Sequence, residues 1–200
     1  MEGEKQRECC TVFVPALLTL RECLARCGLI CILVDHRFYL SNPAIKQIRE
    51  LPGCSSSACS GNDKVVGFGY LHSKREYKVI NFFYRGPSCS FRDGQLKHLK
   101  CEILTLNEVG GISNGWKEIA RRPPYHPDIT GLLVNECMYW FANLHDYYRP
   151  VDQIVALDFE NAKFLTISRP SCFEYLYGLE MMDLKGMLCL HDANLVPCGY

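Results

Sequence analysis

The amino-acid sequence predicts an all-β protein built from repeated four-stranded antiparallel units. The first observation behind this prediction is a hairpin pattern, in which two apolar runs flank a short polar turn, over residues 65–85, 130–143 and 177–192. The second is an apolar run that ends at Asn or Asp, turns, and continues into another apolar run, over residues 38–51, 103–119 and 154–167. Two hairpins in series make a four-stranded antiparallel unit.

The hairpin pattern rests on its turns and on the residues beside them. The turns are polar and read HSKRE, NE and DLKG. The flanking runs are rich in Val, Ile, Phe and Tyr, which suit the pleated, half-buried surface of a strand. Each of these stretches is therefore expected to supply the first two strands of a unit.

The second pattern rests on the residues where its first run ends, which are Asn42, Asn107 and Asp158. Asn and Asp hydrogen-bond to their own backbone two residues on and tolerate left-handed geometry, so they favour turns. The second run in each stretch closes at a large apolar residue, namely Ile48, Trp116 and Phe164. These stretches are expected to supply the last two strands of a unit, and both tryptophans are expected to fill unit cores.

The spacing of the units predicts a β-propeller. Units begin near residues 65, 130 and 177, which is the period of propeller blades rather than of helical solenoid repeats. Residues 28–51 would give strands two to four of one blade, 65–119 and 130–167 two full blades, and 177–192 half of another. The expected fold is a partial propeller of about three to four blades, whose open edges invite self-association or strands from another chain.

Two similar stretches lie far apart in the chain, GLICILVD from Gly28 and GMLCLHD from Gly186. In the propeller interpretation both are second strands of a blade. Each glycine is expected to let neighbouring backbones approach closely.

Composition narrows the classes of partner. The chain has 22 basic and 22 acidic residues, a net charge of zero, so no nucleic acid or membrane partner is predicted. Its 13 cysteines form no CxxC pair and several lie in apolar runs, which favours reduced structural thiols over disulfides or a metal site. A cytoplasmic or nuclear location follows.

The N-terminal part contains an apolar run of about ten residues, TVFVPALLTL, which is too short to span a bilayer. It has acidic residues before it and no small-residue cleavage site after it, which disfavours a signal peptide. A buried strand or short helix is the preferred interpretation.

Catalytic interpretations find little support. The six histidines form no HxxxH or HExxH pair, and GFGY lacks the spacing of a phosphate-binding loop. The dipeptides His145–Asp146 and His191–Asp192 would place their side chains on opposite faces of a strand. No catalytic, cofactor-binding or metal-binding residue is predicted, and no cofactor.

Long loops are the candidates for partner binding. The stretches 85–100, 120–129 and 143–153 would share one face of a propeller, and together they carry three more basic than acidic residues. Arg and Tyr are enriched at binding hot spots, although long loops are also polar simply because they are solvated. The predicted partner-binding residues are Arg92, Lys97, Arg121, Arg122, Tyr125, His126, His145, Tyr147, Tyr148 and Arg149.

Six segments, in order, resemble the F-box-associated domain, type 1, of plant F-box proteins: CGLICILVDHRFYLSNPAIKQIRELP, VVGFGYLHSKREYKV, GWKEI, GLLVNECMYWFA, IVALDFENAKFLTI and LKGMLCL. The resemblance covers about residues 27–192. Two positions depart from the family pattern. Glu136 stands where a Val-Asn-Gly turn usually has Gly, and the stretch 157–159 only loosely matches Phe-Asp.

The resemblance implies a kelch-like β-propeller that captures protein substrates for an SCF-type ubiquitin ligase and is not itself an enzyme. Residues 1–26 contain no recognisable F-box and form a segment of uncertain structure, while residues 27–200 form the F-box-associated domain, truncated at its C-terminal end. Binding to the ligase adaptor is not expected without an F-box. A kelch-like propeller with a carbohydrate-binding or enzymatic role is the alternative.

Overall fold

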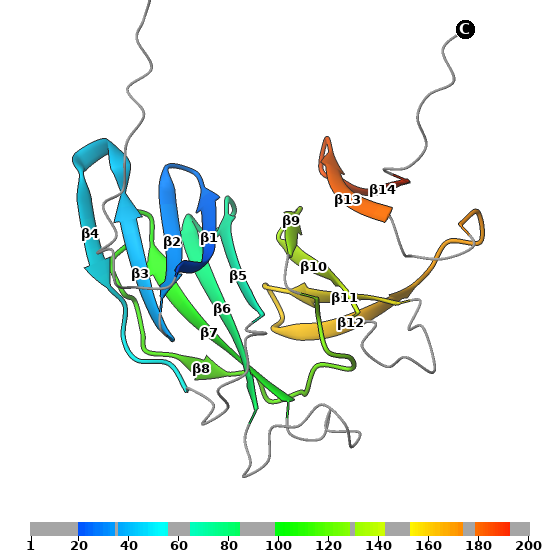
Figure 1. Ribbon diagram of the computed structural model, residues 1–200, viewed down its shortest axis with the longest axis horizontal. Helices are drawn as coiled ribbons and strands as arrows, with labels where there is room; N and C mark the ends of the chain where they lie inside the picture. Colours follow the sequence, from blue (N-terminus) through cyan, green and yellow to red (C-terminus); the bar gives the residue numbers. More distant parts are fainter. Residues whose placement is uncertain are drawn as a thin grey trace, which may run out of the picture. The chain divides into compact units, whose positions relative to one another are not determined.

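The computed structural model describes residues 20–34, 36–55, 65–84, 99–128, 131–142, 153–173 and 179–192. Their regular elements are antiparallel strands, apart from one short 3-10 turn, η1 (Pro43–Ile45) (Figure 1). The strands form three four-stranded sheets and one two-stranded sheet, each a simple meander. The all-β prediction and the partial propeller of four-stranded blades are confirmed.

The chain divides into two compact units, residues 1–51 and 52–200. The first contains sheet 1, whose strands are β1 (Leu20–Arg26), β2 (Leu29–Val34), β3 (Arg37–Asn42) and β4 (Gln47–Glu50). β1 lies within the segment whose structure the sequence left open. It supplies the first strand that the predicted blade over residues 28–51 lacked.

The second unit contains three sheets. Sheet 2 consists of β5 (Val66–Leu71), β6 (Glu76–Tyr84), β7 (Leu99–Asn107) and β8 (Lys117–Glu118). Sheet 3 consists of β9 (Leu132–Val134), β10 (Cys137–Phe141), β11 (Gln153–Asp158) and β12 (Lys163–Ser168). Sheet 4 consists of β13 (Leu179–Leu184) and β14 (Met187–Asp192). Each predicted hairpin supplies the first two strands of its sheet.

The two glycines of the similar stretches have a different role from the one expected. GLICILVD and GMLCLHD do form second strands, in β2 and β14. Gly28 and Gly186 precede these strands with φ of +83° and +81°, and a Cβ added at either would meet no atom within 4 Å. They therefore serve the left-handed positions of two-residue hairpin turns, not a close approach of backbones.

The predicted Asn and Asp turns are confirmed. Asn42 Oδ1 accepts a hydrogen bond from the Ala44 N–H at 3.1 Å, and Asp158 Oδ1 accepts one from the Glu160 N–H at 2.8 Å. Asn107 Oδ1 accepts one from the Gly111 N–H. Trp116 does not fill a core as predicted: it is partly exposed, and its indole N–H donates to the Pro52 carbonyl at 2.8 Å.

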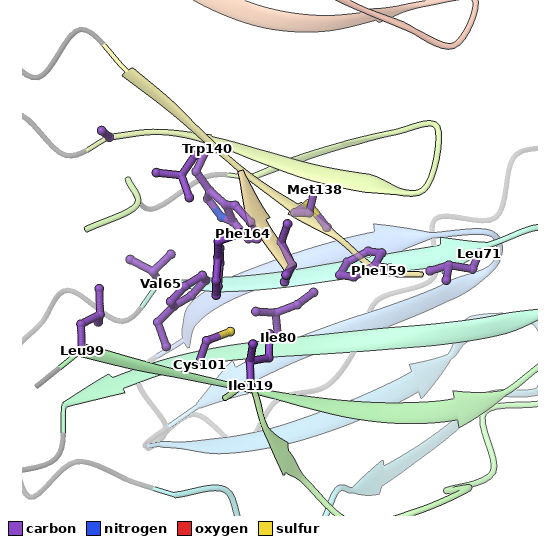
Figure 2. Packing of buried hydrophobic residues seen from close by; sticks show 14 residues of the cluster. Val65, Leu71, Ile80, Leu99, Cys101, Ile119, Met138, Trp140, Phe159 and Phe164 are labelled. Carbon is purple, nitrogen blue, oxygen red and sulfur yellow. The ribbon is translucent and has the colours of Figure 1, made fainter. Parts of the chain in front are cut away.

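The main described core of the second unit lies between sheets 2 and 3. Figure 2 shows the labelled side chains of the two sheets pointing toward one another. Trp140 of β10 is 0% exposed and meets Phe82 of β6 edge to face, with ring centroids 5.2 Å apart. Trp140 thus fills a core as predicted, and it joins two sheets rather than filling one.

The GFGY motif makes room for this core. Gly67 and Gly69 are two residues apart on β5 and so face the same side. A Cβ at Gly67 would lie 3.1 Å from Trp140 Cζ2, and a Cβ at Gly69 would lie 2.9 Å from Leu133 Cδ2. The glycines therefore allow side chains of sheet 3 to approach the backbone of β5.

Candidate protein-interaction surface

The loop 119–128 connects sheet 2 to sheet 3 and is fixed at both ends. At its start Ile119 is buried in the core between the sheets, and its N–H donates to the Cys101 carbonyl at 2.8 Å. At its end the Asp128 N–H donates to the Phe141 carbonyl at 2.7 Å, next to a β-bridge between Pro127 and Ala142. One end is thus held by β7 and the other by β10.

Four of the predicted partner-binding residues lie in this loop. Arg121 and Arg122 are exposed. Tyr125 is half-buried against the core, and the His126 ring stacks on Tyr84 with centroids 5.9 Å apart and planes 18° apart. Tyr125 and His126 therefore hold the loop in place, and the two arginines are the loop's cationic groups presented to solvent.

The remaining predicted residues lie outside the described part of the chain. They are Arg92, Lys97, His145, Tyr147, Tyr148 and Arg149. For these residues partner binding stays a prediction.

A contact between neighbouring hairpin turns joins sheets 2 and 3 a second time. The Glu136 carboxylate, in the β9–β10 turn, accepts hydrogen bonds from the Ser73 N–H at 2.9 Å and the Ser73 hydroxyl at 2.8 Å, in the β5–β6 turn. Glu136 holds a φ of +65° to do so. The family pattern has glycine at this position. The glutamate found here supplies a carboxylate that accepts hydrogen bonds from the turn of the adjacent sheet.

These bonds favour the ionised form of Glu136. The Ser73 hydroxyl, then the Ser73 N–H, lower the pKa of the Glu136 carboxyl below its usual value near 4.5. Positive charge at Lys74 lowers the pKa further. A carboxyl whose pKa is lower in the folded state stabilises the fold above its unfolded pKa, and this contribution is lost as pH falls through the folded pKa.

Replacing Ser73 with alanine is expected to lower the free energy of unfolding at pH 7 by about 0.5–1 kcal/mol, because one exposed charge-assisted hydrogen bond is lost. Urea denaturation between pH 7 and pH 3 measures the effect. The wild-type chain should lose more stability over this range than Ser73→Ala or Glu136→Gln.

Ser171→Ala is the matched control, since Ser171 is an exposed serine away from these turns. It should leave both the stability at pH 7 and the pH dependence unchanged. An unaltered pH dependence in Ser73→Ala and Glu136→Gln would show that the contact does not stabilise the fold.

A buried carboxylate in sheet 2 was not singled out by the sequence. Glu102 of β7 is 2% exposed, and its Oε1 accepts hydrogen bonds from the Asn81 side-chain amide and the Ser55 N–H, both at 2.8 Å. A polar side chain this deep is retained when it is hydrogen-bonded. Glu102 therefore ties the segment at residue 55 to the sheet, and the only sequence signal was an acidic residue inside an apolar run.

Two cysteines of the described strands, Cys101 and Cys137, are poor nucleophiles. Burial, with the charge of Glu102, raises the pKa of the Cys101 thiol, and burial raises the pKa of Cys137. Both are protonated at neutral pH, whereas a nucleophilic cysteine needs the thiolate. Within the described ranges no group of three His, Cys, Asp or Glu side chains could hold a metal ion, and no helix is long and apolar enough for a membrane crossing.

Comparison with known proteins gives a match over nearly the whole chain. A family model described as the F-box associated beta propeller domain matches residues 4–197. F-box protein At3g07870 of Arabidopsis thaliana is 29% identical over 81% of this chain and 42% of its own length. Putative F-box protein At3g52320 of the same species is 25% identical over 72% of this chain and 34% of its own length. The chain spans less than half the length of these relatives.

Proposed function

The chain belongs to the family of F-box-associated β-propeller domains, and on that premise we propose that it is a protein-interaction module that binds a client protein. Its relatives are named F-box proteins, which supports a substrate-recognition role of the kind found in SCF-type ubiquitin ligases. In this proposal the module binds and does not catalyse. Cys101, Cys137, Cys172 and Cys189 are free thiols, which supports a cytoplasmic or nuclear location.

The proposal assigns client binding to residues of the loop 119–128. Because both ends of the loop are bonded to sheets, binding a partner there costs little ordering of the backbone. Arg121 and Arg122 supply charge and multiple hydrogen-bond donors at its exposed part. We assign the client contact to these two arginines, with Tyr125 and His126 as positioning residues.

Charge reversal tests this assignment. The double variant Arg121→Glu, Arg122→Glu is expected to weaken binding of a client by about ten-fold or more, because interface arginines often dominate affinity. The full chain is used as bait, with and without an appended F-box, and clients retained by both baits are purified. Their dissociation constants are then measured by calorimetry against the wild-type and variant chains.

Lys117→Glu is the control, since Lys117 is an exposed basic residue on β8 outside the loop. It reverses one charge, as each of the two arginine substitutions does, and should leave client affinity within about two-fold of wild type. Equal affinity of every client for wild type and the double arginine variant would refute the role of the loop. Failure of both baits to retain any common protein would refute the proposed function.

A further inference from the structure

The connection between β7 and β8 forms a bulge in sheet 2. Ile103 of β7 pairs with Lys117 of β8, and Leu106 of β7 forms an isolated bridge with Ile112. Four residues of the connection, 113–116, therefore lie opposite two residues of β7. Extra residues in a ladder are left unpaired and bend the strand, so this stretch lacks the regular hydrogen bonding of a strand.

The bulge contains the one Asn–Gly pair of the sequence, Asn114 and Gly115. Both residues are exposed, and a Cβ added at Gly115 would meet no atom within 4 Å. Other turn asparagines are held in place: Asn107 accepts a hydrogen bond from a backbone N–H, and the Asn161 amide donates to Asp158 at 2.7 Å. Among the described residues, neither the Asn114 side chain nor the Gly115 N–H is held by such a bond.

An unrestrained Asn–Gly pair can modify itself. A peptide nitrogen is a weak nucleophile because its lone pair is delocalised into the carbonyl, so the reaction begins when hydroxide removes the Gly115 proton. The nitrogen then bonds to Cγ of Asn114, and the side-chain amide takes a proton from water and leaves as ammonia. Water opens the resulting cyclic imide at one of its two carbonyls. Opening at Cγ gives aspartate, and opening at the main-chain carbonyl gives isoaspartate.

The bulge meets the conditions that this reaction requires. The Asn114 side chain must rotate onto the following nitrogen, and it is exposed with no bond to break first. The backbone at Gly115 must adapt to the ring, and glycine is the residue with the widest range of backbone angles. A pair of the same sequence inside a regular ladder would have its N–H engaged and its backbone fixed.

The next residue after this pair holds the start of the second unit on sheet 2. The Trp116 indole N–H donates to the Pro52 carbonyl at 2.8 Å, and the Ser55 N–H donates to the buried Glu102 carboxylate at 2.8 Å. The segment 52–55 is thus attached to sheet 2 at two points. Isoaspartate adds a methylene group to the main chain shortly before Trp116, which displaces the indole from its acceptor.

We propose that Asn114–Gly115 is a self-modification site, at which conversion to isoaspartate releases Pro52 from Trp116 and loosens the segment 52–55. Conversion to aspartate adds the same negative charge but leaves the main chain at its normal length, so it keeps the Pro52 bond. The site is separate from the loop 119–128 and does not depend on the client binding proposed for that loop.

Mass spectrometry tests the modification. The full chain is incubated in mildly alkaline buffer, and the tryptic peptide 101–117 is followed over time. Its mass rises when oxygen replaces the amide NH, and electron-transfer fragmentation locates the change and distinguishes isoaspartate from aspartate. We expect conversion at Asn114 at a rate within about ten-fold of that in a free synthetic peptide of the same residues, because the bulge does not restrain the pair. Asn107 lies in the same peptide and should convert at least about ten-fold more slowly.

Gly115→Ala is the variant that separates the reaction from the fold. Its Cβ restricts the backbone at the attacking nitrogen, so conversion should slow by about ten-fold or more. The same Cβ would meet no atom within 4 Å, so the urea midpoint should stay unchanged.

Hydrogen exchange at the Ser55 amide measures the effect on the segment 52–55. Unconverted wild type is compared with the isoaspartyl form, separated by chromatography, and with the variants Asn114→Asp and Trp116→Phe. Exchange should be about three-fold faster or more in the isoaspartyl form and in Trp116→Phe, which lacks the indole donor. Exchange in Asn114→Asp should stay within about two-fold of wild type, because the charge alone does not lengthen the main chain.

Three results would overturn the proposal. If the free peptide converts and the folded chain does not, the fold protects the pair and there is no modification site. Equal conversion rates in Gly115→Ala and wild type would show that the amide is lost without attack by the Gly115 nitrogen. Unchanged Ser55 exchange in the isoaspartyl form would refute the release of Pro52.

Discussion

Replacing Trp140 with alanine is expected to lower the free energy of unfolding by about 3–5 kcal/mol, because a fully buried indole is replaced by a cavity. Trp140 is 0% exposed and lies in the cluster that joins sheets 2 and 3, against Phe82 of the neighbouring sheet. A single domain is stable by about 5–15 kcal/mol, so much of its stability would be lost. The urea midpoint, at an unchanged slope, measures the loss.

The other tryptophan is the matched control for this prediction. Trp116 is partly exposed and its indole N–H donates to the Pro52 carbonyl at 2.8 Å. Trp116→Ala removes a partly buried indole and one neutral hydrogen bond. We therefore expect the free energy of unfolding to fall by no more than about 2 kcal/mol. Equal losses in the two variants would contradict the central position of Trp140.

Features that depend on a few neighbouring residues were predictable from the sequence. Asn42 and Asp158 mark turns because their side chains bond the backbone two residues on, and the structure contains those bonds. The sequence also contains a local signal for β1, namely Gly28. Cys27 and Gly28 form a two-residue hairpin turn with positive φ at both positions, and glycine favours such a turn.

Features that depend on two sheets could be recognised only in part. Glu136 stood out as an unusual residue for its turn, but its bond to Ser73 joins residues 63 positions apart. The GFGY glycines are explained by Trp140 and Leu133, which belong to a later sheet. A sequence pattern shows where a small residue is needed but not which distant side chain requires it.

In the candidate site, too, local features could be predicted from the sequence and contacts with distant residues could not. A polar, proline-containing loop predicted exposure, and Arg121 and Arg122 are exposed. Tyr125 and His126 lie in the same loop but pack against neighbouring aromatic and apolar groups, which composition could not distinguish. The half blade expected over residues 177–192 corresponds to sheet 4, which packs on sheet 3.

The second large effect is expected from adding one methyl group at Gly131, immediately before β9 of sheet 3. A Cβ at Gly131 would lie 2.5 Å from Trp140 Nε1 and 2.8 Å from Trp140 Cε2, closer than atoms can pack. Gly131→Ala should therefore displace the buried indole and lower the free energy of unfolding by about 1–3 kcal/mol. Gly115→Ala is the control, because a Cβ there would meet no atom within 4 Å.

A smaller ring at position 140 should relieve the strain that Gly131→Ala creates. Among the described residues, Trp140 Nε1 has no hydrogen-bond partner, so Trp140→Phe removes aromatic volume without breaking a hydrogen bond. Residues in contact are not additive in their effects, and the double variant should be more stable than the sum of the single losses predicts, by about 1 kcal/mol. Urea denaturation of the four chains gives this coupling energy. Strict additivity would mean that the alanine methyl does not meet the indole, and the close packing of Trp140 over Gly131 would then be refuted.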